Sequence, residues 1–190
     1  MYINLTNRCS CDCVFCIRAN GDSVGDADTL WLSREPTLDE IKADFVKEDL
    51  SDVIEIIFCG YGEPLERAEL VVQVCEFIKS ETDILVRLNT NGIVGLIAPD
   101  FDVQKLSVLD AISISLNSDN AIDYHKATRS IFGETAFNEL LSFAQKVNVF
   151  TKVYFTVVKF PGCEKFWNEQ KCKKLSEKMG ISLRIREYSG

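Results

Sequence analysis

The chain has 190 residues, of which 46% are hydrophobic and 26% are charged; this predicts a single globular domain over residues 1–190 and excludes a disordered or low-complexity chain. No apolar run reaches the roughly 20 residues that a membrane-spanning helix needs, and the first residues lack the basic and apolar stretches of a secretory signal, so we expect a cytoplasmic protein with no membrane partner. The net charge of −8 argues against a nucleic-acid partner, although residues 121–190, with 12 basic and 7 acidic side chains, leave room for a basic face.

Strand patterns and helical patterns alternate along the chain. In chain order the sequence predicts a strand at 2–7, a helix at 37–50, a strand at 53–59, a helix around 70–78, strands at 84–89 and 111–117, a helix around 137–147, a strand at 152–158, a helix through 167–179 and a strand at 182–188. Thr37 and Glu40 form a capping box at the start of the first helix, and Gly180 is a suitable left-handed cap for the last. Residues 93–110 are irregular, and Pro99 interrupts them.

This alternation predicts an α/β protein with mostly parallel strands and with helices outside the sheet. A closed barrel of eight strand–helix units usually takes about 250 residues. Six strands in 190 residues therefore predict a partial (β/α)6 TIM-like barrel that is open at one side. In such folds the active site lies at the carboxyl ends of the strands.

Eight cysteines are the most informative part of the composition. Cys9, Cys13 and Cys16 follow the first strand with two short gaps, and thiolates on one loop are the usual ligands of a [4Fe–4S] cluster, where three ligands leave one iron open. A structural zinc site generally uses two separated ligand pairs, and no second pair is visible. Cys11 does not fit the spacing and is expected to neighbour the cluster. The remaining cysteines are interpreted as buried free thiols: Cys59, Cys75, Cys163 and Cys172.

Four motifs at successive strand ends resemble those of radical S-adenosylmethionine (radical SAM) enzymes. CSCDCVFC at 9–16, with Phe15 before the last cysteine, resembles the CxxxCxφC motif of that superfamily. The others are GYGEP at 60–64, which resembles GGEP, LNTNG at 88–92, which resembles LxTNG, and ISLN at 114–117, which resembles the IS-L-D/N segment. Within the superfamily, the chain is most similar to the small TatD-associated radical SAM protein family, and the resemblance rests on the segments NLTNRC, FCIRANGD, FCGYGEP, RLNTNG, ISLN and IREY.

The resemblance implies a [4Fe–4S] cluster on Cys9, Cys13 and Cys16 that binds SAM at its open iron and reductively cleaves it to methionine and a 5′-deoxyadenosyl radical. The radical abstracts hydrogen from an unknown substrate, a small molecule or a protein, and a flavodoxin- or ferredoxin-like protein donates the electron. Two alternatives stay open: a glycyl-radical activating enzyme that acts on a protein partner, and a non-catalytic iron–sulfur electron carrier.

The SAM contacts are also implied by the resemblance, and comprise Phe15, Gly60, Gly62, Glu63, Asn89, Asn91, Ser115 and Arg129. Glu63 receives the SAM ammonium group in this interpretation, Ser115 the ribose or methionyl part, and Arg129 the carboxylate. The plainer interpretation makes the glycines and asparagines turn residues and Arg129 a surface residue. Tyr61 stands where the family has a second glycine.

Three further features each have two interpretations. His125, the only histidine, is either structural or in contact with substrate. The segment 17–35 is either a surface loop or a lid over the substrate, with Trp31 as its anchor or as a pocket wall. Arg184 and Arg186 alternate on the last strand and either meet an anionic substrate inside the open barrel or lie on a solvated edge.

Overall fold

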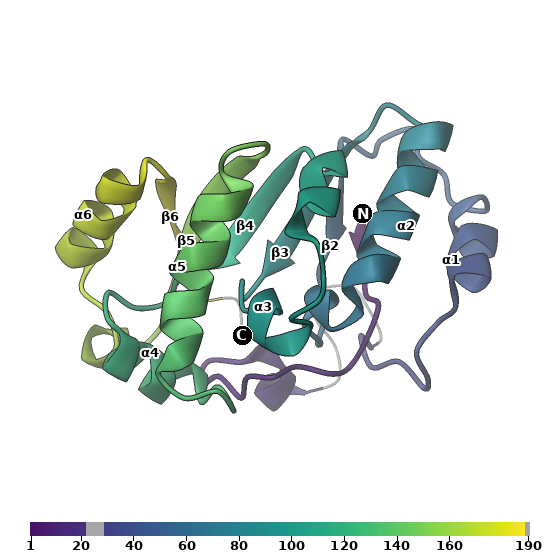
Figure 1. Ribbon diagram of the computed structural model, residues 1–190. Coiled ribbons are helices and arrows are strands. Elements are labelled where there is room, and N and C mark those ends of the chain that lie inside the picture. The colour runs from purple at the N-terminus through teal and green to yellow at the C-terminus, as the bar shows by residue number, and fades with distance from the viewer. Residues whose placement is uncertain (22–28, 189–190) are drawn as a thin grey trace.

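A six-stranded parallel sheet organises the computed structural model, which describes residues 1–21 and 29–188 (Figure 1). Its strands are β1 (Tyr2–Ile3), β2 (Glu55–Phe58), β3 (Leu85–Thr90), β4 (Ala111–Ser115), β5 (Lys152–Lys159) and β6 (Ser182–Glu187). They pair in the order β1-β2-β3-β4-β5-β6, so β1 and β6 do not pair with each other. The fold is therefore the α/β partial (β/α)6 barrel, open at one side, that the sequence predicts.

Helices cover the outer face of this sheet: α2 and α5 lie in front of the strands in Figure 1, and α6 lies beside β6 at the left end. The α-helices are α1 (Leu38–Phe45), α2 (Ala68–Glu81), α3 (Val94–Ile97), α4 (Ala121–Thr128), α5 (Thr135–Val147) and α6 (Glu169–Met179), and the short 3-10 helices are η1 (Ile17–Asn20), η2 (Pro64–Arg67), η3 (Val103–Val108) and η4 (Cys163–Lys165). The described chain contains no helix that is both long and apolar enough to span a bilayer.

The two faces of the sheet differ in polarity because successive side chains of a strand point to opposite sides. Phe58, Leu88, Ile114 and Phe155 have no exposed surface and pack with Phe143 of α5 in one apolar core. The alternate positions carry polar side chains on β3, β4 and β5: Arg87, Asn89, Ser113, Ser115 and Thr156. The concave side of the barrel is therefore polar.

The caps that the sequence predicts are confirmed, whereas two element lengths were wrong. Thr37 and Glu40 form the capping box of α1, and Gly180 closes α6 in the left-handed conformation. The helix predicted over 37–50 ends at Phe45, because the backbone N–H groups of Lys47 and Glu48 donate to carbonyls three residues back instead of four. The strand predicted over 2–7 is only Tyr2–Ile3, because Asn4 turns the chain by accepting a hydrogen bond from the backbone N–H of Thr6.

Helix α4 (Ala121–Thr128) was not predicted, and it supports the cysteine segment at the carboxyl ends of the strands. The backbone N–H of Asp12 donates to the Thr128 carbonyl at 2.9 Å, and that of Val14 donates to the Ala127 carbonyl at 2.9 Å. These carbonyls are accessible because Arg129 ends the helix in the left-handed conformation, with φ of 49°. In Figure 1 the purple N-terminal segment passes below the strand ends to reach α4.

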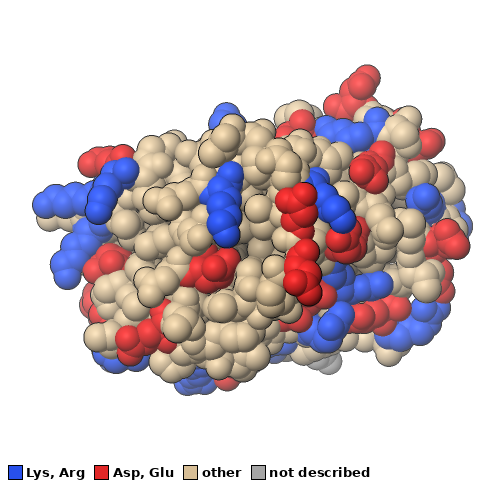
Figure 2. All heavy atoms as spheres, in the orientation of Figure 1, with Lys and Arg blue, Asp and Glu red and all other residues tan. Residues whose placement is uncertain are grey.

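Charge is distributed unevenly over the surface. Several Lys and Arg side chains lie at the end of the molecule formed by α6, on the left of Figure 2, with acidic side chains among them. Helix α6 itself contributes Lys171, Lys173, Lys174 and Lys178 against Glu169 and Glu177. Basic side chains therefore outnumber acidic ones on this helix.

Candidate cofactor-binding site

A cavity of about 310 Å³ lies at the carboxyl ends of the strands, within the size range of small-molecule sites. Its walls come from the cysteine segment, the loops after β2, β3 and β4, the strands β5 and β6, and helix α4. Every predicted cluster ligand and SAM contact except Arg129 lines it: Cys9, Cys13, Cys16, Phe15, Gly60, Gly62, Glu63, Asn89, Asn91 and Ser115. Residues that are far apart in sequence thus meet in one place, at the position the fold predicts.

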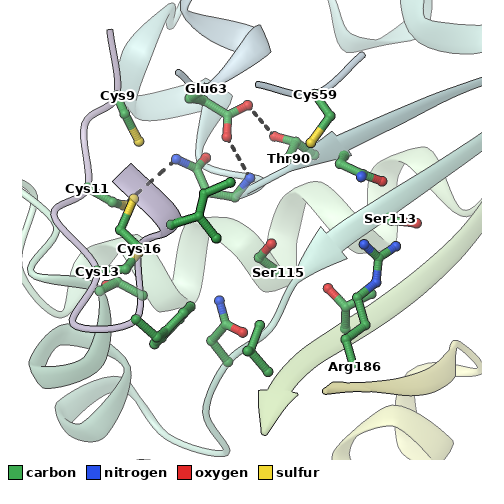
Figure 3. A pocket seen from close by; sticks show the side chains of 18 of the residues that line it. Cys9, Cys11, Cys13, Cys16, Cys59, Glu63, Thr90, Ser113, Ser115 and Arg186 are labelled. Atoms are coloured by element: carbon green, nitrogen blue, oxygen red, sulfur yellow. Dashed lines mark hydrogen bonds between the residues drawn. The ribbon is translucent and has the colours of Figure 1, made fainter. Parts of the chain in front are cut away.

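The cysteines gather at one side of this cavity, where Figure 3 shows Cys9, Cys11, Cys13 and Cys16. All four thiols are free. Hydrogen bonding to Cys11, together with burial, raises the pKa of the Cys9 thiol. Thiolates are the metal-binding form, so metal loading here releases protons.

The arrangement of the thiols bears on the kind of metal centre that fits. Among the described residues, no three Cys, His, Asp or Glu side chains stand close enough together to hold a metal ion as they are. In an iron–sulfur cluster each thiolate binds its own iron, so the thiols need not converge on one point. The donor set, thiols on one loop facing a cavity, fits such a cluster.

The two motif glycines allow two backbone segments to pack together. A Cβ atom at Gly62 would lie 2.1 Å from the carbonyl oxygen of Thr6, and one at Gly60 would lie 2.2 Å from the side chain of Asn4. The loop after β2 therefore packs directly on the segment that leads into the cysteines. The close approach that the sequence suggested for a ligand is made here by the chain's own N-terminal segment.

Tyr61, the departure from the family motif, binds the following loop. Its hydroxyl donates to the carbonyl of Gly21 at 2.9 Å, and its ring lies 4.8 Å from that of Trp31, measured between centroids. Tyr61 is buried, while Trp31 keeps 39% of its surface exposed. The segment 17–35, interpreted from the sequence as either a surface loop or a lid, lies partly outside the described residues, and Tyr61 contacts Gly21 and Trp31 in its described parts.

Glu63 is buried, with 4% of its surface exposed, and its carboxylate lies against the end of β3. It accepts hydrogen bonds from the Thr90 hydroxyl at 2.6 Å and the Asn91 backbone N–H at 2.7 Å (Figure 3). It also accepts one from the Leu65 backbone N–H at 3.1 Å. Burial nevertheless raises the pKa of Glu63 to about 7. A cation in the cavity would favour the ionised form.

Two polar groups of the cavity wall have no hydrogen-bond partner among the described residues. They are the Tyr124 hydroxyl and the Asn117 side-chain oxygen, both buried and both lining the cavity. Asn117 also has a positive φ of 47°, which is uncommon for a residue other than glycine. Buried polar groups without partners are costly, so these atoms indicate a polar ligand. Sequence reasoning missed Tyr124 because it missed α4.

Other cavity residues had a signal in the sequence that was not used. Ser113 and Thr156 line the cavity, and each lies on the polar face of its strand. The period of two that groups Ser115 with Asn117 also includes Ser113. Cys59, which was predicted to be a buried core thiol, lines the cavity at the end of β2.

Arg129 is the predicted site residue that the structure does not bring to the cavity. Its side chain is 60% exposed, and its guanidinium lies 3.3 Å from a carboxylate oxygen of Asp12. His125 does not line the cavity either, although its Nδ1 is buried without a partner among the described residues. Cys163 and Cys172 also lie away from the cavity.

Known proteins resemble the chain in sequence. GTP 3′,8-cyclase from Paenarthrobacter nicotinovorans is 27% identical over 144 residues, which cover 70% of this chain and 35% of that protein. A probable GTP 3′,8-cyclase from Methanocaldococcus jannaschii is 32% identical over 132 residues, which cover 70% of this chain and 40% of that protein. The chain thus spans less than half the length of these curated relatives.

Solved structures share the fold, and a family model matches most of the chain. TYW1 with a lysine-pyruvate adduct bound has a TM-score of 0.65 at 13% identity, over 96% of this chain and 62% of its own. Native anSMEcpe with bound AdoMet has a TM-score of 0.63 at 16% identity, over 98% of this chain and 50% of its own. The model of the Radical SAM superfamily matches residues 3–162. The chain therefore belongs to the Radical SAM superfamily.

Proposed function

We propose that Cys9, Cys13 and Cys16 hold the [4Fe–4S] cluster of a radical SAM enzyme and that SAM binds beside it in the cavity described above. Membership of the superfamily makes the chain an enzyme that uses a [4Fe–4S] cluster and SAM. The observation that carries the residue assignment is the convergence of the cysteine segment and three strand-end motifs on one cavity. When bound, the cluster supplies the electron that cleaves SAM into methionine and a 5′-deoxyadenosyl radical, which takes a hydrogen atom from the substrate.

The residues around the thiols suit the binding of SAM. Glu63 offers a buried carboxylate to the ammonium group, and this pairing would offset the burial that raises its pKa. The Tyr124 hydroxyl and the Asn117 side-chain oxygen offer a donor and an acceptor to a polar ligand. Phe15 lies 5.0 Å from Phe160, between ring centroids, and supplies apolar surface at the same wall.

Asn91 joins the third motif to the cysteine segment. Its side-chain oxygen accepts from the backbone N–H of Ile93 at 3.1 Å, and its side-chain nitrogen lies 3.8 Å from the sulfur of Cys11. This supports a role for Cys11 as a structural neighbour of the cluster, held by Asn91, with the three ligands around it. Asn91 then positions the cysteine segment relative to β3.

Arg129 belongs to this proposal only if its guanidinium leaves Asp12 for the SAM carboxylate. Arg129→Ala tests the exchange through SAM affinity, measured by calorimetry on cluster-loaded protein. Weaker binding would add Arg129 to the site. Unchanged binding would leave Arg129 as a surface partner of Asp12, and would leave the other assigned residues as they are.

The test of the function is anaerobic reconstitution followed by reduction in the presence of SAM. Wild-type protein should carry about four irons and release 5′-deoxyadenosine. Cys13→Ala should lose the cluster and the product, whereas Cys163→Ala, which changes a thiol outside the cavity, should keep both. Cys11→Ala should also keep the cluster. A four-iron wild type that releases no 5′-deoxyadenosine would overturn the proposal in favour of an electron carrier.

A further inference from the structure

Three arginines lie on the concave side of the barrel, Arg87 on β3 and Arg184 and Arg186 on β6. Arg184 and Arg186 are two residues apart on one strand and therefore face the same side. The three guanidinium groups have different interaction partners, and Arg186 differs from the other two in this respect.

Arg87 is fully engaged within the protein. Its guanidinium forms a two-point ion pair with Glu55 of β2, at 3.0 Å and 2.7 Å. It also donates to the side-chain oxygens of Asn89 and Ser113, each at 3.3 Å. These contacts leave Arg87 no free donor fork for a ligand, although its charge remains close to the cavity.

Arg184 is engaged in a different way. Its guanidinium carbon lies 3.4 Å from the centroid of the Tyr154 ring, a close cation–π contact. It does not line the cavity.

Arg186 lines the cavity, and its side chain makes no hydrogen bond or ion pair with the described residues. The adjacent Glu187 does not neutralise it, because that carboxylate lies 3.3 Å from the ammonium nitrogen of Lys159. Burial and the nearby charges of Arg87 and Arg184 lower the pKa of Arg186, which is the response of a cation placed among cations. An anion would relieve that repulsion.

The position of Arg186 separates it from the cofactor end of the cavity. Figure 3 shows Cys9, Cys11, Cys13 and Cys16 on one side and Arg186 on the opposite side, extending from β6 toward Ser113, with Ser115 between them. The hydroxyls of Ser113 and Ser115 donate no hydrogen bond within the described residues, so both can donate to a ligand. A group held by Arg186 therefore lies within the same cavity as the predicted cluster ligands Cys9, Cys13 and Cys16 but on the opposite side from them.

We propose that Arg186 binds an oxyanion, a carboxylate or phosphate group, of a small-molecule substrate, with the hydroxyls of Ser113 and Ser115 as further donors. This inference rests on the proposed function, since it places the substrate of that same site. The planar guanidinium fork matches both oxyanions in two-point geometry. The remaining part of the substrate then extends toward the cysteine end, where the hydrogen atom is removed.

The experiment measures oxyanion binding directly. Inorganic phosphate and malonate are titrated separately, by calorimetry, into anaerobically reconstituted protein saturated with SAM, and the probe that binds identifies which oxyanion the site prefers. Arg186→Gln should lower the affinity for the preferred probe at least tenfold. Arg184→Gln is the matched control, with the same charge change on the same strand, and should change binding less than twofold. Arg186→Lys keeps the positive charge but loses the two-point geometry of the guanidinium. Its affinity for the probe should therefore lie between those of Arg186→Gln and Arg184→Gln.

Several results would overturn the inference. The inference is wrong if wild-type protein binds neither phosphate nor malonate. It is also wrong if Arg186→Gln and Arg184→Gln lose the same affinity for the probe, because the probe would then respond only to the general positive charge of the strand. A loss of SAM affinity in Arg186→Gln would assign the guanidinium to SAM instead. Because probe binding needs no turnover, a failure of the proposed function, seen as no 5′-deoxyadenosine from wild type, is distinguishable from a failure of this inference.

Discussion

At the scale of single residues, the cavity wall combines groups that the protein satisfies with groups that it leaves open. Glu63 accepts three hydrogen bonds, whereas the Tyr124 hydroxyl and the Asn117 side-chain oxygen have no partner among the described residues. An unsatisfied buried polar group costs about 1–3 kcal/mol. Such a cost in the ligand-free state becomes binding free energy when a ligand supplies the missing partner.

Tyr124→Phe should therefore separate stability from binding. The substitution removes a hydroxyl that has no partner among the described residues, so the ligand-free variant should unfold at the same temperature as wild type or slightly higher. SAM affinity should fall by about 1 kcal/mol, roughly fivefold. Thermal unfolding and calorimetry measure the two effects.

The matched control for that experiment is Tyr61→Phe. The Tyr61 hydroxyl is also in a buried residue but donates to the Gly21 carbonyl at 2.9 Å. Its loss should destabilise the ligand-free protein by about 1 kcal/mol. A Tyr124→Phe protein as destabilised as Tyr61→Phe would show that the Tyr124 hydroxyl already has a partner.

Glu63 predicts a pH dependence of SAM binding. With a pKa of about 7 in the ligand-free protein, the carboxyl group is half protonated at neutral pH, and only the ionised form pairs with an ammonium group. SAM affinity should rise about tenfold between pH 6 and pH 8 through this group. Glu63→Gln should bind SAM weakly and lose that rise, which calorimetry at several pH values would show; an equal rise in the variant would exclude Glu63 as its source.

The same group has the opposite effect on folding. Its folded-state pKa lies above the ordinary value of 4.5, so the proton favours the folded state. The contribution to the free energy of unfolding is complete below pH 4.5 and is lost as the pH rises through about 7. In denaturant titrations of ligand-free protein, wild type should lose more stability across this range than Glu63→Gln.

At the scale of elements, the loop after β2 and the segment before the cysteines form one packed unit. Gly62→Ala places a Cβ atom 2.1 Å from the Thr6 carbonyl oxygen and 2.7 Å from that of Arg8, so backbone has to move. We expect a loss of roughly 2–3 kcal/mol in unfolding free energy and a lower iron content, because Arg8 precedes Cys9. Denaturant titration and iron analysis measure these effects.

Gly95→Ala is the control for this packing. Its added Cβ atom meets the carboxylate of Glu139, the mobile end of a long side chain, and alanine is favoured over glycine in a helix such as α3. Its stability should match that of wild type or exceed it slightly. Equal losses in the two variants would mean that the Gly62 contact has no special role.

Much of the fold could be predicted because it depends on local periodicity. The strand segments ending at Phe58 and Thr90 carry their burial pattern in the sequence, and so does the capping box at Thr37. Helix α4 could not be predicted in this way, because it buries only Tyr124, Ala127 and Thr128 and lacks a long apolar stripe. Its helical state depends on contacts with the cysteine segment, which local patterns do not contain.

The candidate site likewise contains residues that the sequence could predict and residues that it could not. Glycines, cysteines and Glu63 were identified by their spacing, and they line the cavity. Tyr124 and Arg186 could be assigned to the site only from the three-dimensional structure. The Tyr124 hydroxyl has no hydrogen-bond partner among the described residues, and Arg186 lies near two other arginines. Spacing alone did not distinguish Arg186 from Arg184, whereas the stacking of Arg184 on Tyr154 does.

At the scale of the whole molecule, the cysteine segment depends on a helix made much later in the chain. Arg129, which closes α4, and its partner Asp12 are 117 residues apart. Ribosomes add roughly 5–20 residues per second, so the cysteines emerge on the order of ten seconds before the carbonyls that hold them. During that interval the cysteine segment lacks its two backbone hydrogen bonds to α4, so we expect it to reach its final arrangement only after Thr128 has been added to the chain.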